Sequence, residues 1–269
     1  MADARKLELD GSEGTLYAEV WPHPDARYIA IVVHGYAEHI GRYAHVIERL
    51  AADGATVYGL DHLGHGRSEG ERALITEGEH LTTDLQLLVE LARSENPDLP
   101  VVMIGHSMGG LIATRYAQTH PGNLDALVLS GPVIGANPAI AALLVLDPVP
   151  EVPIDPAVLS RDPAVGEAYL ADPLVYNGPF KPETLRALFA GVAAVAEGPG
   201  FGSLPVLWIH GADDALVPYG SVAEAFEHVR GEASEERAYP GARHEIFNET
   251  NRDEVLDDVV AFINAQISS

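Results

Sequence analysis

The feature of this sequence that most constrains its fold is the stretch of residues 101–110, which reads VVMIGHSMGG. Four apolar residues run directly into the pattern Gly-x-Ser-x-Gly, and residues 111–117 continue with helical character. This order predicts a buried strand, a sharp turn and a helix, with Ser107 in strained backbone at the apex and its hydroxyl exposed above the sheet. An incidental serine in a glycine-rich turn would give the same five letters, so the rest of the chain has to supply the context.

Strands and helices alternate on both sides of this turn. Strands are expected at residues 6–9, 15–20, 28–33, 56–60, 101–104, 126–130, 206–210 and 236–239, and further helices at residues 42–52, 81–93, 221–229 and 252–267. The first two strands, separated by residues 10–14, are typical of an antiparallel hairpin. The remaining alternation predicts an α/β fold in which a mostly parallel eight-stranded sheet is flanked by helices.

Residues 132–202 break this alternation. The segment is rich in proline and contains two short apolar stretches, residues 139–146 and 185–196. In the second stretch, Leu185, Leu188, Phe189, Val192 and Val195 fall on one face of a helix. Because ligands of open α/β sheets bind at the carboxyl ends of the strands, we expect residues 132–202 to form a cap over a core made of residues 1–131 and 203–269. The apolar face would then roof the pocket, pack against the core, or do both.

A serine hydroxyl is a poor nucleophile at neutral pH and needs a histidine base that is oriented by a carboxylate. In a fold of this kind the three groups follow the order serine, acid, histidine along the chain. The acid is therefore expected after the strand at residues 206–210, where Asp213 and Asp214 are both candidates. His244 is the only histidine in the loop after the last predicted strand, and we predict that it is the base.

The oxyanion formed during ester cleavage needs two preorganised N–H donors. One is expected from the backbone of Met108, directly after the serine, and the other from Tyr36, in the loop after the strand at residues 28–33. His62 and His65, together with Asp61, superficially suggest a metal site. The loop that contains them is rich in glycine, which favours a structural role for these side chains instead. We therefore predict that no metal is bound there. We also predict no cofactor.

Several segments together resemble the monoacylglycerol lipases and lysophospholipases of the α/β-hydrolase superfamily, which share a serine aminopeptidase-like domain. The matching segments are residues 34–43 (HGYAEHIGRY), 61–70 (DHLGHGRSEG), 105–110, 211–217 and 239–244, with shorter cap fragments at residues 154–156, 159–161 and 172–174. The resemblance implies the α/β-hydrolase fold, and it implies that Asp214 rather than Asp213 is the acid. It also implies that Glu38, Arg42 and Tyr169 hold the glycerol headgroup, although Glu38 and Arg42 could instead only tie their loop together through a salt bridge.

The function that the resemblance implies is a serine ester hydrolase of the monoacylglycerol lipase type, acting on a small-molecule ester through an acyl-enzyme. Residues 139–153 are shorter than the cap segment expected for such a lipase, so a general carboxylesterase for soluble short-chain or aryl esters is the alternative. A non-catalytic binding protein of the same fold is a third possibility, but such proteins usually lose one of the three groups of the site.

Charge limits the partners of this chain. Forty acidic residues against sixteen basic ones give a net charge of -24, which repels nucleic acid and offers no basic patch to an anionic membrane. No apolar run is long enough to span a bilayer, although an apolar cap can still contact a neutral lipid interface. The polar first fifteen residues and the absence of cysteine lead us to expect no signal peptide and a cytoplasmic location. No oligomeric state is predicted.

The excess of acidic residues also suggests adaptation to high salt. Salt screens repulsion between like charges, because the Debye length falls from about 10 Å at 0.1 M to about 3 Å at 1 M. We therefore expect the midpoint of thermal unfolding to rise over that range of KCl. A parallel series in sucrose, which stabilises proteins without screening charge, is the control. A midpoint that does not rise with KCl would contradict the idea.

Overall fold

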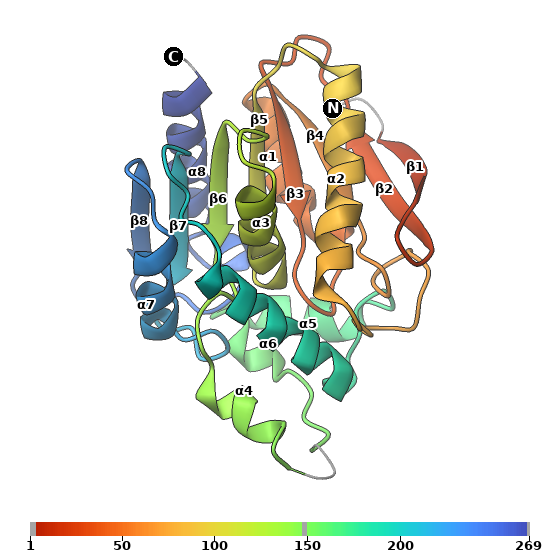
Figure 1. Cartoon of the computed structure of the whole chain (residues 1–269), viewed down its shortest axis with the longest axis vertical. Helices are drawn as coiled ribbons and strands as arrows, with labels where there is room; N and C mark the ends of the chain where they lie inside the picture. Colours follow the sequence, from red (N-terminus) through yellow and green to blue (C-terminus); the bar gives the residue numbers. More distant parts are fainter. Residues whose placement is uncertain (1–3, 147–149, 268–269) are drawn as a thin grey trace.

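A computed structural model describes residues 4–146 and 150–267 of the chain. The parts of the predicted core and cap at residues 1–3, 147–149 and 268–269 lie outside the described residues. Eight strands form one sheet in the order β1-β2-β4-β3-β5-β6-β7-β8 (Figure 1). They are β1 (Arg5–Asp10), β2 (Thr15–Trp21), β3 (Tyr28–Val33), β4 (Ala55–Leu60), β5 (Val101–His106), β6 (Ala126–Ser130), β7 (Val206–Gly211) and β8 (Ser234–Tyr239).

The sheet confirms the predicted fold class. The pairs β1–β2 and β2–β4 are antiparallel, and every pair from β4 to β8 is parallel. Strands β3 to β7 are buried along their whole length, as expected for parallel strands covered on both faces. Strand β5 lies between β3 and β6, so the turn that follows it opens near the middle of the carboxyl edge.

Helices cover the two faces of the sheet. On one face, α1 (Ala44–Ala52), preceded by the 3-10 turn η1 (Ile40–Tyr43), and α8 (Arg252–Ile267) contribute to one apolar cluster. On the other face, α2 (Gly78–Glu95), α3 (Met108–Thr119) and α7 (Tyr219–Val229) contribute to a second cluster (Figure 1). The helix predicted from residue 42 therefore begins two residues later than expected, after a tighter turn.

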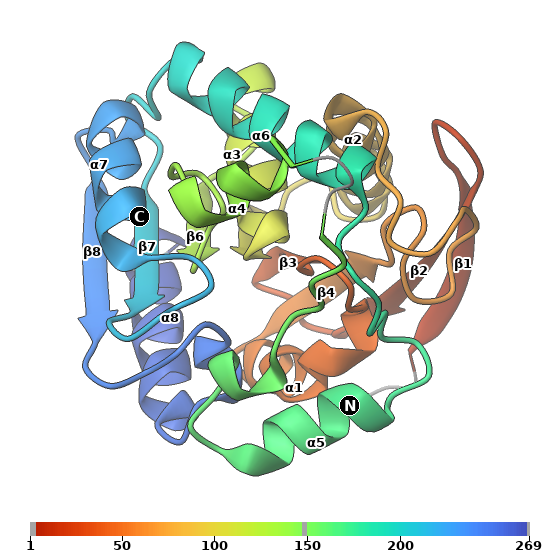
Figure 2. The ribbon, with the colours of Figure 1, turned by 90° about the horizontal axis from the view of Figure 1, so that it is seen from below.

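The segment 132–202 lies at the carboxyl edge of the parallel strands (Figures 1 and 2). It contains α4 (Pro138–Leu143), the 3-10 turn η2 (Pro156–Val158), α5 (Pro163–Ala171) and α6 (Pro182–Glu197). Helix α6 packs against α3 of the core. We propose on this basis that residues 132–202 are a cap on the core of residues 1–131 and 203–269.

Helix α5 was not predicted from the sequence. It begins with a recognisable signal, since Asp162 caps the backbone N–H of Ala164 at 3.0 Å and Pro163 occupies the first helical position. Tyr169 is its one buried residue, so the helix has no apolar face for a periodicity argument to detect. The helix-capping signal of Asp162 and Pro163 was present in the sequence, but an apolar periodicity that would predict packing was not.

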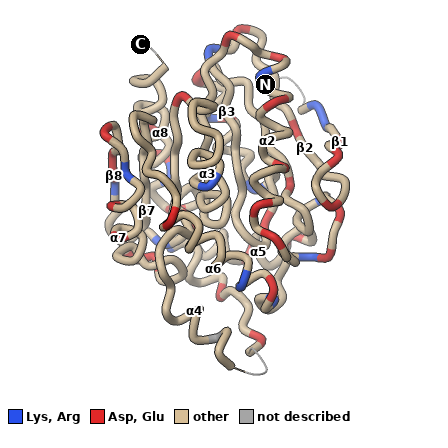
Figure 3. Tube along the Cα trace, in the orientation of Figure 1, with Lys and Arg blue, Asp and Glu red and all other residues tan. Residues whose placement is uncertain are grey.

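The surface matches the acidic composition. Figure 3 shows Asp and Glu positions in many parts of the trace, with Lys and Arg interspersed among them, although residues 99–124 contain no acidic residue. Each helix within residues 4–146 and 150–267 is too short or too polar to cross a bilayer.

The turn between β5 and α3 depends on close approach of backbone. Ser107 has a φ of 55° and a ψ of -119°, a conformation that non-glycine residues rarely adopt. A Cβ atom on Gly109 would stand 2.1 Å from the carbonyl oxygen of Val33 and 2.6 Å from that of His34. The missing side chain therefore lets the first turn of α3 press against the end of β3.

We predict that Gly109→Ala lowers the free energy of unfolding by roughly 2–4 kcal/mol, because the added methyl group overlaps backbone atoms that cannot move independently. Gly220 in α7 provides the matched control, since a Cβ atom there would have no neighbour within 4 Å. Gly220→Ala should leave the protein as stable, or stabilise it by up to about 1 kcal/mol. Chemical denaturation of the two variants measures the difference, and equal stability would contradict this account.

Candidate active site

Three side chains from separate loops meet at the carboxyl edge of the sheet. Nε2 of His244 lies 2.8 Å from Oγ of Ser107, and Nδ1 of His244 lies 2.7 Å from Oδ2 of Asp214. All three residues are at least nine-tenths buried. Ser107 follows β5, Asp214 follows β7 and His244 follows β8, which is the chain order expected from the sequence.

The structure distinguishes the two candidate aspartates. Oδ1 of Asp214 accepts the backbone N–H groups of Leu216 at 2.9 Å and Val217 at 2.8 Å, which leaves Oδ2 directed at His244. Asp213 is exposed, and among the described residues it is Asp214 that forms the hydrogen bond with His244. Of the two aspartates, Asp214 is therefore the one that the fold brings into contact with His244.

A second histidine, His210, supports Asp214 and was missed by the sequence analysis. Its Nδ1 accepts the indole N–H of Trp208 at 3.0 Å, so the ring proton is on Nε2. That Nε2–H donates to the carbonyl oxygen of Val217 at 2.8 Å and lies 3.3 Å from Oδ2 of Asp214. His210 was noted only as one of several strand-end histidines, and the nearby tryptophan gave no signal of this contact.

Burial and pairing act in opposite directions on the pKa values of the two ionisable groups. Burial favours the neutral acid of Asp214, but His244 and His210 outweigh it and hold the pKa of Asp214 well below its usual range. Burial likewise favours the neutral imidazole of His244, but Asp214 outweighs it and raises the pKa of His244, with further contributions from Glu245 and Glu38. The pair is therefore arranged to stabilise a positive charge on the imidazole.

Two backbone N–H groups beside Ser107 are free to bind a ligand. Tyr36 and Met108 both line the cleft that contains Ser107 and His244. Within the described residues, neither backbone N–H donates to a protein acceptor, as expected for the first residue of a helix in the case of Met108. A Cβ atom on Gly35 would stand 3.1 Å from Cβ of Ser107, so the loop that carries Tyr36 runs close to the serine.

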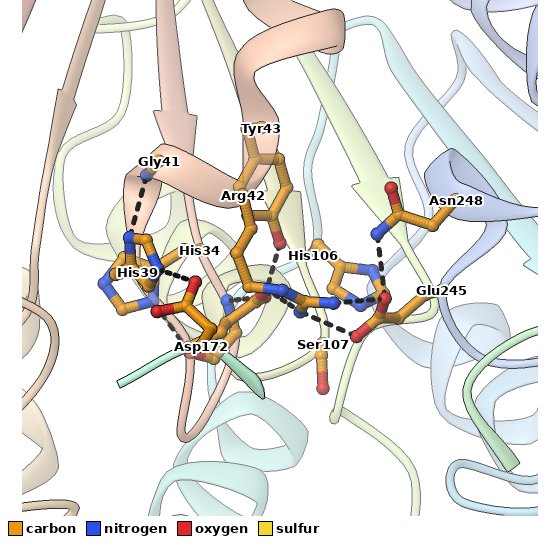
Figure 4. Close-up of polar contacts among 12 residues, drawn as sticks. His34, His39, Gly41, Arg42, Tyr43, His106, Ser107, Asp172, Glu245 and Asn248 are labelled. Carbon is orange, nitrogen blue, oxygen red and sulfur yellow. Dashed lines mark hydrogen bonds and ion pairs between the residues drawn. The ribbon is translucent and has the colours of Figure 1, made fainter. Parts of the chain in front are cut away.

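The residues that the resemblance assigned to headgroup binding form a buried cluster. Nη1 of Arg42 donates to Oε2 of Glu38 at 2.6 Å, and both Nη atoms donate to the two carboxylate oxygens of Glu245 at 2.8 Å. Figure 4 shows the guanidinium of Arg42 directed at Glu245. Glu38 lines the cleft, whereas Arg42 is not among the residues that line it.

Glu245 is the charged residue at this site that the sequence analysis missed. It directly follows His244, and that adjacency was the available signal. Glu245 is only 5 % exposed, and it makes a bidentate contact with Arg42, which lies 203 residues earlier in the chain. Both properties arise only in the folded structure.

The cleft itself is largely apolar. Helix α6 contributes Leu185, Leu188, Phe189 and Val192 to its lining, while Leu185 and Val195 are buried. The apolar face of this helix therefore both lines the cleft and packs against neighbouring residues. Tyr169 also lines the cleft, and its buried hydroxyl has no hydrogen-bond partner within the described part of the chain.

The loop that superficially suggested a metal site is held in place by hydrogen bonds to the side chain of Asp61. The carboxylate of Asp61 accepts the N–H groups of Ile40 and Arg67 at 2.8 Å each. Burial lowers the pKa of His62 to about 3 and that of His65 to about 4. Among the described residues, no group of three or more His, Cys, Asp or Glu side chains is arranged to hold a metal ion.

This site is typical of the α/β-hydrolases. Its serine lies in a strained strand-to-helix turn and is hydrogen-bonded to a histidine at the carboxyl edge of an eight-stranded α/β sheet. Residues 24–251 match the family model described as "Serine aminopeptidase, S33". The monoacylglycerol lipase of Mycolicibacterium smegmatis is 39% identical over 255 residues, covering 91% of each chain. The human monoglyceride lipase is 31% identical and covers 94% of this chain and 86% of the relative.

A solved structure adds to these sequence relatives. The monoacylglycerol lipase of Paleococcus ferrophilus superimposes with a TM-score of 0.81 at 28% identity, covering 93% of this chain and 99% of the other. The chain belongs to the serine aminopeptidase S33 family of α/β-hydrolases, and it is an ester hydrolase of the monoglyceride lipase type.

The buried histidines near the site generate a prediction about stability. A histidine with a depressed pKa binds fewer protons in the folded than in the unfolded state. As the pH falls below about 6.5, proton uptake therefore favours the unfolded state, and the free energy of unfolding decreases. For His62 this decrease reaches about 2 kcal/mol at pH 5. We therefore expect His62→Phe to gain stability relative to the original protein between pH 7 and pH 5, measured by denaturation in urea.

His228 gives the control for this experiment, because its ring lies exposed on α7 and stays hydrated in the folded state. His228→Phe therefore shows what the same substitution does to stability at a position where the imidazole is not buried. If His62→Phe showed the same pH dependence as the original protein, the burial of His62 would not have the assigned effect.

Proposed function

We propose that the chain hydrolyses monoglycerides through an acyl-enzyme formed on Ser107, with His244 as the base and Asp214 as the acid that orients it. The observation that carries this proposal is the continuous contact from Ser107 Oγ to His244 Nε2 at 2.8 Å and from His244 Nδ1 to Asp214 Oδ2 at 2.7 Å. Both distances are those of a hydrogen bond, so a proton can pass from the hydroxyl to the imidazole without rearrangement.

In the first half of the reaction, Oγ of Ser107 forms a bond to the ester carbonyl carbon while its proton passes to Nε2 of His244. The carbonyl π electrons move to oxygen, and the oxyanion is held by the N–H groups of Tyr36 and Met108. Asp214 stabilises the imidazolium without taking its proton. The oxyanion then re-forms the carbonyl, the bond to the alcohol oxygen breaks, and the proton on Nε2 passes to the leaving glycerol.

In the second half, water takes the place of the alcohol. Nε2 of His244 accepts one proton from water as the water oxygen bonds to the acyl carbon, and a second oxyanion forms in the same position. Its collapse breaks the bond to Ser107 Oγ, which recovers the proton from His244. The products are a fatty acid and the free enzyme.

The lining of the cleft supports a substrate with an apolar and a polar part. The side chains of α6, together with Ile154 and Leu159, suit an acyl chain, whereas Glu38 and the unpartnered hydroxyl of Tyr169 suit the hydroxyl groups of glycerol. We assign Arg42 a supporting role, because its guanidinium is already engaged by Glu38 and Glu245. The names of the relatives support the same substrate class.

Contact of the cap with a neutral lipid surface is a further part of this proposal. Exposed apolar side chains of the cap support it, namely Val145, Leu146, Val152 and Leu170. The cytoplasmic location stays a prediction.

A hydrolysis panel tests the proposal. Monoglycerides with acyl chains of increasing length are compared with p-nitrophenyl esters of the same acids. We expect the highest kcat/KM for medium or long monoglycerides, because the apolar cleft gains binding free energy of about 0.8 kcal/mol for each buried methylene group. A maximum at acetyl or butyryl esters would favour the alternative of a carboxylesterase for soluble substrates.

Variants of the three proposed residues serve as controls in the panel. Ser107→Ala should lower kcat by about 10⁴-fold or more, and Asp214→Asn by roughly 10³-fold to 10⁴-fold. Asp213→Asn provides the matched control for the second variant and should stay within about threefold of the original rate. Retention of near-original rates by Ser107→Ala would overturn the proposed mechanism.

A further inference from the structure

One guanidinium connects the two loops that hold the proposed catalytic groups. Arg42 contacts Glu38 in the loop after β3 and Glu245 in the loop after β8. Glu38 in turn accepts the backbone N–H of Gly35 at 2.7 Å, which fixes the peptide next to Tyr36. Glu245 directly follows His244, so the cluster joins the proposed oxyanion loop to the loop of the proposed base.

The cluster holds more negative than positive charge. Oε1 of Glu38 accepts from Gly35 N–H and from the hydroxyl of Tyr43 at 2.6 Å, and Oε2 accepts from Arg42. Every partner of Glu38 donates to it, which favours its carboxylate, whereas burial, together with Glu245, raises the pKa of its carboxyl group against the effect of Arg42. Glu245 accepts three hydrogen bonds, two from Arg42 and one from Asn248 at 2.8 Å, so it too is a carboxylate. Two carboxylates therefore share one guanidinium in a buried site.

The groups that face His244 can be named element by element. Asp214 approaches from the loop after β7, and the ring of His106 at the end of β5 lies 4.8 Å away between ring centroids. Glu38, in the loop after β3, lines the same cleft as His244 and is paired with Arg42 of η1, and Glu245 comes from the histidine's own loop. Burial and His244 lower the pKa of His106 to about 3, so His106 is neutral and contributes no charge.

We propose that the surplus negative charge of the Glu38–Arg42–Glu245 cluster stabilises the imidazolium form of His244, and that Glu245 is the positioning residue through which the cluster acts. The proposal rests on the proposed function of His244 as the base. Asp214 supplies the directional hydrogen bond. The cluster, whose Glu245 adjoins His244 in the chain, supplies a second negative potential. Glu245 does not touch the reacting atoms; it acts on the charge that the base acquires.

The consequence is a change in pH dependence. The reaction of Ser107 requires neutral His244, so its rate rises with pH through the pKa of that imidazole. A nearby negative charge favours imidazolium and moves this rise to higher pH. Loss of the charge should move the rise to lower pH and should also slow the reaction on the plateau, because imidazolium forms in the transition state.

The test compares Glu245→Gln with the original protein by the rate of labelling with a fluorophosphonate, measured from about pH 4.5 to pH 9. This reaction depends on Ser107 and His244 but needs no particular ester. The acid limb is the part of the pH profile in which the labelling rate rises with pH. For Glu245→Gln we expect the acid limb to lie roughly 0.5–1 pH unit lower and the plateau rate to fall by roughly threefold to tenfold. Glu245→Asp keeps the charge, so its acid limb should stay at the original pH even if its rate falls.

Glu249 gives the matched control, as a second buried glutamate in the same loop. It accepts from Nε of Arg161 at 2.9 Å and from the N–H of Arg243 at 2.8 Å. Glu249→Gln should not shift the acid limb, whatever it does to stability.

Each outcome of this test has a distinct meaning. An original protein that fails to label would overturn the proposed function itself. An original protein that labels normally, with a folded Glu245→Gln whose acid limb is unshifted, would overturn only the role of the cluster. If circular dichroism shows that Glu245→Gln does not fold, Glu38→Gln removes the other charge of the cluster and must shift the limb in the same direction for the inference to stand.

Discussion

The hydrogen bond between Asp214 and His244 is the interaction on which the candidate site depends. It holds the imidazole at one end, and only this leaves the other nitrogen directed at Ser107. The carboxylate can perform this role because the backbone of the same loop occupies its second oxygen. The orientation of one side chain thus follows from a tight turn at the end of β7, and the parallel register of β5 to β8 brings that turn next to the serine.

The site concentrates features that cost stability. Ser107 has a strained φ, several histidines are buried in neutral form, and a cluster of three charges is removed from water. Each of these would be unfavourable in isolation. They persist because the continuous apolar layers on the two faces of the sheet fix the strand ends from which the loops begin. The rigidity of the core is therefore a condition for the geometry of the site.

The sequence allowed the fold and the serine to be predicted, since both are encoded in local patterns. Strand periodicity and the Gly-x-Ser-x-Gly turn do not depend on distant contacts. The choice between Asp213 and Asp214 was different: the residues alone left it open, and a family resemblance was needed to favour Asp214. Residues that act through long-range contacts, such as His210 and Glu245, have no local signature of those contacts, even though Glu245 directly follows His244 in the sequence. Helix α5 lies between these cases, since its capping aspartate and proline were visible but its packing was not.

The cap and the base loop are also mechanically connected. The N–H of Glu245 donates to the carbonyl oxygen of Leu159 in the cap at 2.8 Å, and Arg161 of the cap binds Glu249 beyond it. The loop of His244 is therefore held on one side by Arg42 from the core and on the other by cap residues that follow η2. Because a cap that lines the acyl cleft also fixes the loop of the proposed base, changes in cap length alter more than the shape of the cleft. Residues 158–161 therefore both border the cleft, through Leu159, and hold the loop of the proposed base, so an exchange of the proposed cap between relatives would have to preserve this contact.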